Sequence, residues 1–129
     1  MSYVEVLNEA DIKFGKKLWQ SLRKNAKFPI QGIFWLLQPR SAEWHLVIAT
    51  PKVDQLGQRD AYRELADVTQ NVKADSSQLL KIELISPNEE LYQGLRSVFA
   101  KAASVEGARL GNTQVQGLFI NDAYLYVVR

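Results

Sequence analysis

Two apolar runs that lie close together constrain the fold more than any other feature of the chain. Residues 31–38 and 43–50 are rich in β-branched and aromatic side chains, and a short connection with turn chemistry at Pro39 and Ser41 joins them. This pattern predicts a β-hairpin. The first run is apolar at every position from Ile33 to Leu37, which is typical of a strand covered on both faces. We therefore expect this strand at the centre of a sheet.

The remaining pattern alternates helices with strands. Apolar side chains at helical spacing predict helices over residues 8–25, over 59–72 and from 86 to about 107. Strict alternation predicts a strand over 79–85, and two last strands, 113–120 and 123–128, flank a tight turn at Asn121-Asp122. The expected order is α-β-β-α-β-α-β-β, an α+β fold (α/β mixed) with a mixed five-stranded sheet and helices packed against it. A single domain spanning residues 1–129 fits this length.

Capping residues predict where two of the helices begin. Asn8 is a suitable N-cap, and the acidic residues Glu9 and Asp11 follow it in the first turn. Ser86 at an N-cap, with Pro87 at the first helical position and Glu89 two residues later, predicts the start of the last helix.

Composition removes several function classes. The chain contains no cysteine, so disulfides, thiolate nucleophiles and cysteine-based metal sites are excluded. The net charge of +2, from 16 basic and 14 acidic residues, does not by itself indicate a nucleic-acid binder. The N-terminus lacks the pattern of a secretory signal, and no segment approaches the roughly 20 apolar residues of a membrane span. We expect a cytoplasmic protein with no membrane partner.

His45 is the only histidine, and it lies in the second strand. A general base needs an orienting partner, and a metal ligand needs companions of a suitable type. No second histidine and no cysteine accompany it, so we interpret His45 as a half-exposed strand residue. We expect no catalytic residue, no metal ligand and no cofactor.

One carboxylate pattern favours a different hypothesis. Magnesium-dependent nucleases of the restriction type combine an acid on one strand with a Glu-x-Lys pair on the next. Lys81 and Glu83 offer this pair in the reverse order, with Asp54 or Glu43 as a remote acid. Alternating charges are also common on a solvated strand face. A metal-dependent phosphodiesterase is therefore our third hypothesis.

A basic stripe along the first predicted helix is the strongest functional feature. At 100° per residue, its cations and Gln20 fall within a third of the helix circumference, and no acid lies among them. Such a stripe is either an ordinary solvated helix face or a contact surface for a polyanion or an acidic partner. The cations are Lys13, Lys16, Lys17, Arg23, Lys24 and Lys27.

Aromatic residues near the C-terminus are a second candidate surface. Phe119, Tyr124 and Tyr126 belong to the last predicted hairpin, whose final strand we expect at the edge of the sheet. They pack in the core, or they contact a partner or a second copy of the chain.

Residues 44–57, WHLVIATPKVDQLG, together with Ala61-Tyr62, resemble a segment of small uncharacterised bacterial α/β proteins of unknown function. The likeness extends over about a third of the chain. It implies a bacterial, cytosolic, stand-alone domain, and it implies no activity or site residues.

The leading hypothesis from the sequence is a non-enzymatic accessory or interaction domain. It would act through a protein partner or through self-association as a homo-oligomer, with the terminal hairpin or the basic helix as its contact surface. The alternative is a nucleic-acid-associated protein that contacts phosphates through the basic helix without reading bases.

Overall fold

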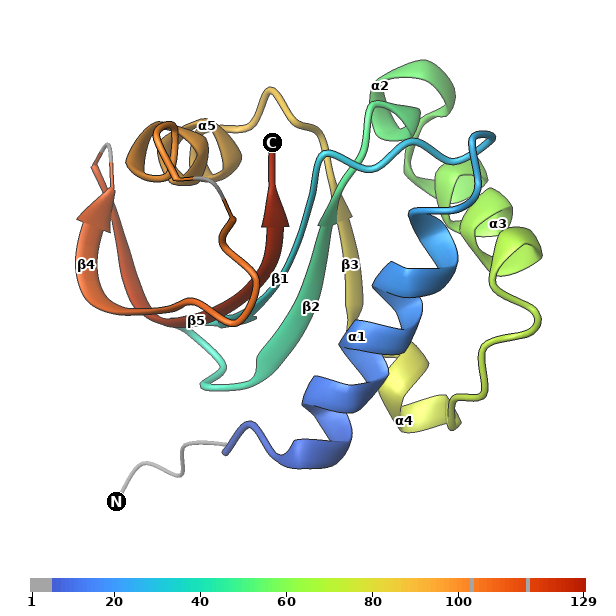
Figure 1. Cartoon of the computed structure of the whole chain (residues 1–129), viewed down its shortest axis with the longest axis horizontal. Helices are drawn as coiled ribbons and strands as arrows, with labels where there is room; N and C mark the ends of the chain where they lie inside the picture. Colours follow the sequence, from blue (N-terminus) through green and yellow to red (C-terminus); the bar gives the residue numbers. More distant parts are fainter. Residues whose placement is uncertain (1–5, 103, 116) are drawn as a thin grey trace.

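The computed structural model describes residues 6–102, 104–115 and 117–129, and its centre is a five-stranded sheet in the order β3-β2-β1-β5-β4 (Figure 1). Only β2 and β3 pair in parallel, so the sheet is mixed, and the predicted α+β fold is confirmed. The strands are β1 (Gly32–Leu37), β2 (Trp44–Ala49), β3 (Ile82–Ile85), β4 (Arg109–Val115) and β5 (Leu118–Val128).

Helices cover both faces of this sheet. One face packs against α1 and α3, and the other packs against α5, which lies over β4 and β5 in Figure 1. The main helices follow the predicted order, and two short helices that the sequence did not predict lie between them. The helices are α1 (Glu9–Leu22), α2 (Lys52–Leu56), α3 (Gln58–Val68), α4 (Ser76–Leu79) and α5 (Glu90–Val98).

Strand β1 is the central strand, as its unbroken apolar run predicted. Ile33 and Trp35 are buried in the core on the α1 side, whereas Phe34 and Leu36 are buried in the core on the α5 side. Successive side chains of a strand point to opposite faces, so five consecutive apolar residues supply both cores.

Helix α1 begins at the predicted N-cap. The side chain of Asn8 accepts a hydrogen bond from the backbone N–H of Asp11 at 2.9 Å, and the Asp11 carboxylate accepts one from the N–H of Asn8 at 3.4 Å. Together these bonds form a capping box, which explains why a carboxylate is buried here. The helix ends at Leu22, short of the predicted residue 25.

A β-bulge in β5 changes the side chains that face α1. Ile33 pairs with Val127 and Phe34 pairs with Leu125, so Tyr126 is an extra residue opposite β1. The bulge directs both Tyr126 and Val127 to the α1 side. Strict alternation along this strand would place Leu125 and Val127 on one face, but the bulge places Leu125 in the core on the α5 side and Val127 on the α1 side.

The predicted last hairpin is also wrong, because Asn121 and Asp122 lie inside β5. The chain turns instead at Gly117, whose φ of 84° suits a residue without a Cβ. Asn and Asp tolerate such geometry but do not require it. Here the Asp122 carboxylate accepts two hydrogen bonds of 2.7 Å from Arg109 on β4. Strand β4 is consequently the edge strand, and β5 lies between β1 and β4.

The predicted start of the last helix is displaced by several residues. Helix α5 begins at Glu90, and Ser86 does not cap it. The Ser86 hydroxyl donates to the Asp54 carboxylate, 2.8 Å from each oxygen, and its oxygen accepts from the N–H of Asn88 at 3.1 Å. These contacts hold a turn before the helix. The helix then ends at Val98, well before residue 107.

Helix α3 closes one edge of the sheet. The Tyr62 hydroxyl donates to the carbonyl of Ile82 at 3.2 Å and accepts from the N–H of Leu84 at 2.9 Å, and the Gln58 amide donates to the carbonyl of Leu84 at 3.0 Å. Side chains therefore satisfy the outward backbone groups of β3, which protects this edge from pairing with another strand.

Candidate functional site

The basic stripe lies on the outer surface of α1 and the turn that follows it. Opposite the buried side chains of Phe14, Leu18 and Leu22, every predicted cation is exposed. Within residues 6–102, 104–115 and 117–129, no carboxylate forms an ion pair with any of these cations. We call this surface the basic face; it consists of Lys13, Lys16, Lys17, Arg23, Lys24 and Lys27.

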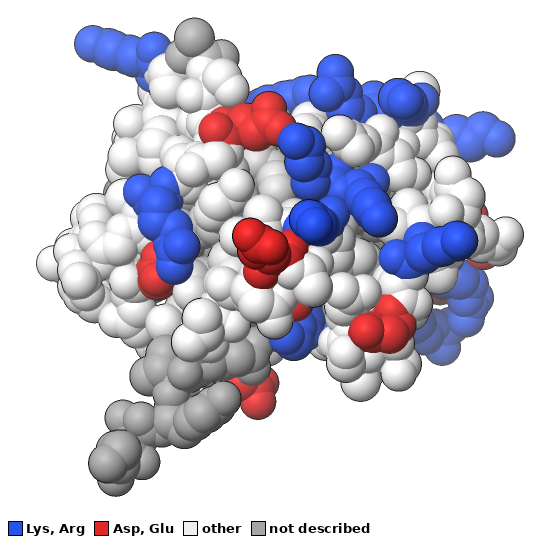
Figure 2. Space-filling view, turned by 60° about the horizontal axis from the view of Figure 1, so that its bottom comes forward, with Lys and Arg blue, Asp and Glu red and all other residues white. Residues whose placement is uncertain are grey.

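Figure 2 shows how charges are distributed on one side of the molecule. Basic side chains gather toward the upper right of that view, and fewer acidic side chains lie among and around them. Cations at this density create a positive local potential, because they outnumber the acidic side chains around them and no described carboxylate forms an ion pair with those of the basic face.

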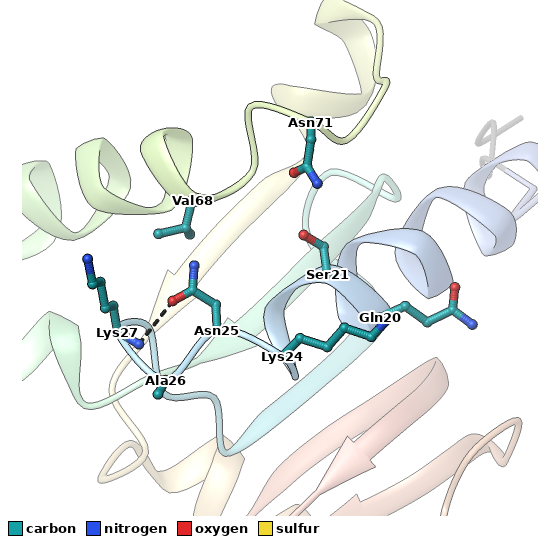
Figure 3. A pocket seen from close by; sticks show the side chains of 8 residues that line it. All are labelled: Gln20, Ser21, Lys24, Asn25, Ala26, Lys27, Val68 and Asn71. Atoms are coloured by element: carbon teal, nitrogen blue, oxygen red, sulfur yellow. Dashed lines mark hydrogen bonds between the residues drawn. The ribbon is translucent and has the colours of Figure 1, made fainter.

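Two adjoining hollows separate the C-terminal part of α1 from the segment that follows α3. The larger has a volume of about 570 Å³ and the smaller about 310 Å³. They share Gln20, Ser21 and Asn71, so they form one continuous groove along α1. Figure 3 shows Ser21 on α1 and Asn71 on the opposite wall pointing toward one another. We refer to the two hollows together as the groove.

Backbone turns hold both walls of the groove. After α1, the N–H of Asn25 donates to the carbonyl of Leu22 at 3.0 Å, and the Asn25 side chain accepts from the N–H of Lys27 at 3.0 Å (Figure 3). On the other wall, the Thr69 hydroxyl donates to the carbonyl of Leu65 at 2.7 Å at the end of α3. The groove is therefore part of the fold and not a gap between loose segments.

The lining of the groove suits an anion. Lys17, Lys24, Lys27 and Lys73 contribute positive charge, and no carboxylate is among the described lining residues. Side-chain amides and one hydroxyl add hydrogen-bond donors between the lysines. The groove thus combines charge with directional donors, which is the combination that phosphate oxygens require.

His45 lies on the sheet face that packs against α5, at the exposed end of β2. Its Nδ1 is 3.2 Å from Oε2 of Glu83, and its Nε2 is 3.8 Å from Oε2 of Glu43. The Gln38 side-chain amide also donates to Glu83 at 3.3 Å. The histidine side chain is 32% exposed and both carboxylates are more exposed. This is a solvated polar cluster around the half-exposed strand histidine that the sequence predicted.

The residues of the phosphodiesterase hypothesis do not converge. Lys81 reaches Asp11 at the start of α1, with Nζ 3.7 Å from Oδ1, whereas Glu83 contacts His45 on the other face of the sheet. Asp54 is hydrogen-bonded to Ser86. In the described ranges, no three His, Asp or Glu side chains are close enough to hold a metal ion.

Three acidic side chains, Glu83, Asp54 and Glu89, lie near one another beside β3. Burial raises the pKa of Glu89 above its ordinary value, and the nearby charges of Glu83 and Asp54 raise it further. This region beside β3 therefore disfavours anions, in contrast to the basic face.

The three residues of the predicted aromatic surface lie in different environments. Tyr126 is 3% exposed in the core, and Tyr124 is half-buried beside it, with ring centroids 5.4 Å apart. Phe119 is 54% exposed near the hairpin turn, next to Leu118 at 36%. Of the three residues of the predicted aromatic surface, Phe119 at the tip of the terminal hairpin is therefore the one most exposed to a partner.

The helical spacing of the sequence predicts the cations of the basic face, but no pattern in the sequence predicts the opposite wall of the groove. Asn71, Val72 and Lys73 carry no motif, and they reach the site only because α3 packs beside α1 on the same sheet face. A polar segment directly after the second long helix was the only available signal.

Comparison of the chain with family models, with curated proteins and with solved structures found no match. Across the described residues, no helix has the length and apolar character needed to cross a membrane. Function must therefore be inferred from the residues of the site itself.

Proposed function

We propose that this chain is a non-catalytic interaction domain that binds the phosphate backbone of a nucleic acid through the basic face and the groove. The observation that carries this proposal is the row of exposed, unpaired cations on α1 and the turn that follows it, which continues across the groove to Lys73 without a lining carboxylate. A phosphate backbone would release condensed counterions on binding to such a surface.

The dimensions of α1 are consistent with this ligand. The helix contains 14 residues, and at about 1.5 Å per residue it is about 21 Å long, which corresponds to about six steps of a nucleic-acid strand. The cations are distributed from Lys13 to Lys27, so several successive phosphates could be contacted at once. Affinity would then come from many weak contacts and would depend strongly on salt.

The lining of the groove favours a nucleic acid over an acidic protein. Protein interfaces normally contain an apolar or aromatic centre. The apolar residues of the groove are only Ala26, Val68 and Val72, and the exposed large apolar side chains of the described chain lie elsewhere. Lysines with amides and a hydroxyl are instead typical of backbone contacts to nucleic acids.

The test measures the affinity of the purified protein for a labelled single strand and for a duplex at about 50 mM and about 200 mM salt. We expect binding at low salt that falls steeply as salt increases. Changing both Lys24→Gln and Lys27→Gln should reduce the slope of log affinity against log salt by about 1 to 2.

A matched control variant distinguishes binding at the basic face from non-specific attraction to the positive charge of the protein. Arg96→Gln with Lys101→Gln removes the same charge from exposed positions in and after α5, on the opposite face of the sheet. We expect this control to retain most of the affinity and the slope. Equal losses in both variants, or no nucleic-acid binding at low salt, would overturn the proposal. Binding of polyglutamate in place of nucleic acid would identify an acidic protein as the partner.

Self-association through the terminal hairpin is a second candidate function. Phe119 and Leu118 are both exposed at the start of β5. The sequence from Leu110 to Ile120 contains no charged residue, so two copies of this segment would not repel one another. Sedimentation analysis of the wild type and of Phe119→Ser tests this candidate: a dimer that the substitution dissociates would support it, and a monomer in both would remove it.

A further inference from the structure

A smaller hollow, separate from the groove, lies beside the turn that follows α1. Its volume is about 180 Å³, and Trp19, Arg23, Pro29 and Arg129 are among its lining residues. It shares Asn25 and Ala26 with the groove. The groove and the smaller hollow therefore adjoin the same short turn. Lysines line the groove, whereas two arginines and an indole ring line the smaller hollow.

Hydrogen bonds hold the backbone of Arg129 in place. Its N–H donates to the carbonyl of Gln31 and to the hydroxyl of Tyr92, both at 2.9 Å. The Tyr92 hydroxyl in turn donates to the carbonyl of Arg129 at 2.8 Å, and Tyr92 is fully buried. These bonds hold the last part of β5 against the core, so the position from which the arginine side chain extends is set by the fold.

The Arg129 side chain is also held at its far end. Its guanidinium carbon lies 5.3 Å from the centroid of the Trp19 ring, within the range of a cation–π contact. Trp19 is 7% exposed, so the indole ring is covered. No described carboxylate pairs with this guanidinium. A planar cation is thus supported on one side by an aromatic ring, with its donors available.

We infer that the guanidinium of Arg129, supported by Trp19, is a stacking platform for an unpaired nucleobase, and that the preferred ligand is therefore a single-stranded nucleic acid. This inference rests on the proposed function. Bases of single strands commonly stack on arginine planes and aromatic rings. A strand whose base stacks on Arg129 would pass around the turn at Asn25, and its phosphates would reach Lys24 and Lys27. A duplex keeps its bases inside the helix and offers no free base to the platform.

One substitution separates the contribution of stacking to single-strand affinity from the contribution of the Arg129 charge. Arg129→Lys keeps the positive charge and every backbone hydrogen bond of residue 129, but it removes the planar group. The loss of one stacked base should weaken single-strand binding by about 5- to 100-fold. The salt dependence should remain that of the wild type, because the number of phosphate contacts does not change.

The experiment measures the affinity of the protein for two single-stranded oligonucleotides of about 12 residues, one normal and one without bases, and for a duplex of the same length. All three are measured at one salt concentration between about 50 mM and about 200 mM. We expect the wild type to bind the normal single strand more tightly than either the abasic strand or the duplex. Arg129→Lys should bind the normal and abasic strands equally well, with an unchanged thermal unfolding temperature.

Two outcomes would overturn the inference. One is wild-type protein that binds the normal and abasic strands equally. The other is an Arg129→Lys variant that retains the wild-type preference for bases. Either result, with salt-dependent binding intact, would leave the proposed function standing, whereas the absence of all nucleic-acid binding would remove both.

Discussion

The ring of Tyr126 occupies the space that a Cβ at residue 15 would need, so Gly15 lets β5 and α1 approach one another closely. The Tyr126 hydroxyl accepts a hydrogen bond from Nε1 of Trp35 at 3.1 Å and donates to the carbonyl of Ile12 at 2.7 Å. This contact joins the bulge in β5 to the helix that carries the basic face.

Gly15→Ala should therefore destabilise the protein. In an ordinary helix interior, this change would increase stability by about 1 kcal/mol. Here, overpacking costs about 1–3 kcal/mol, and displacement of Tyr126 also weakens two hydrogen bonds. We expect a lower free energy of unfolding in urea, while Lys16→Ala on the exposed side of the same helix changes it by less than about 0.5 kcal/mol. A variant at least as stable as the wild type would contradict this contact.

The stability of the protein should decline in alkali because of the same tyrosine. Burial raises the pKa of Tyr126 well above its ordinary value of 10.0, and the pKa values of Tyr62 and Tyr92 are raised in the same direction by burial. The protonated tyrosine is favoured in the folded state. The contribution of Tyr126 to the free energy of unfolding is therefore fully present below a pH of about 10, and it is lost as the pH rises toward the folded-state pKa of this tyrosine.

Urea unfolding at a series of pH values from about 8 to about 11 measures this decline. Tyr126→Phe should flatten the curve, and it should also lower stability at neutral pH by about 1–3 kcal/mol, because Nε1 of Trp35 loses its partner. An identical alkaline decline in the wild type and the variant would show that Tyr126 does not titrate in a buried environment.

Local sequence patterns predicted the central strands and the first helix correctly, because their signals act within a few residues. The apolar run from Ile33 to Leu37 identified the central strand, and Asn8 identified the start of α1. The bulge at Tyr126 could not be predicted in this way, since it depends on how β5 meets β1 and on the space that Gly15 leaves.

The errors at Asn121-Asp122 and Ser86 have a common physical cause. Both segments carry residues suited to turns or caps, but a distant side chain engages one of them: Arg109 binds Asp122, and Asp54 binds Ser86. In the candidate site too, local sequence does not reveal contacts between segments that are distant along the chain. The cations of α1 follow from helical periodicity, whereas Lys73 and Arg129 join them only through the packing of α3 and β5.

The position of the terminal turn gives a simple test of the corrected hairpin. Gly117 has a φ of 84°, so Gly117→Ala should cost about 1–2 kcal/mol of unfolding free energy. Asn121→Ala, inside β5, should cost less, because extended backbone accommodates alanine. Chemical denaturation of both variants decides between the two turns: the reverse order of losses would restore Asn121-Asp122 as the turn.

The closed edge at β3 should be visible in hydrogen exchange. Tyr62→Phe removes the hydroxyl that accepts from the N–H of Leu84, so exchange at this amide should accelerate. Stability should fall by about 1 kcal/mol. The amide of Thr50, which donates to the carbonyl of Ile85 at 3.0 Å within the sheet, serves as the internal control. Unchanged protection at Leu84 relative to Thr50 would mean that Tyr62 does not close this edge.

The most direct test of the central claim is an NMR titration of the labelled protein with a short single-stranded oligonucleotide at low salt. We expect the largest amide shifts at the end of α1, at residues 25–27, at residues 71–73 and at Arg129, which surround the basic groove and the adjoining hollow. Shifts centred on Phe119 and the hairpin tip, or no shifts at all, would contradict a nucleic-acid contact at the basic face.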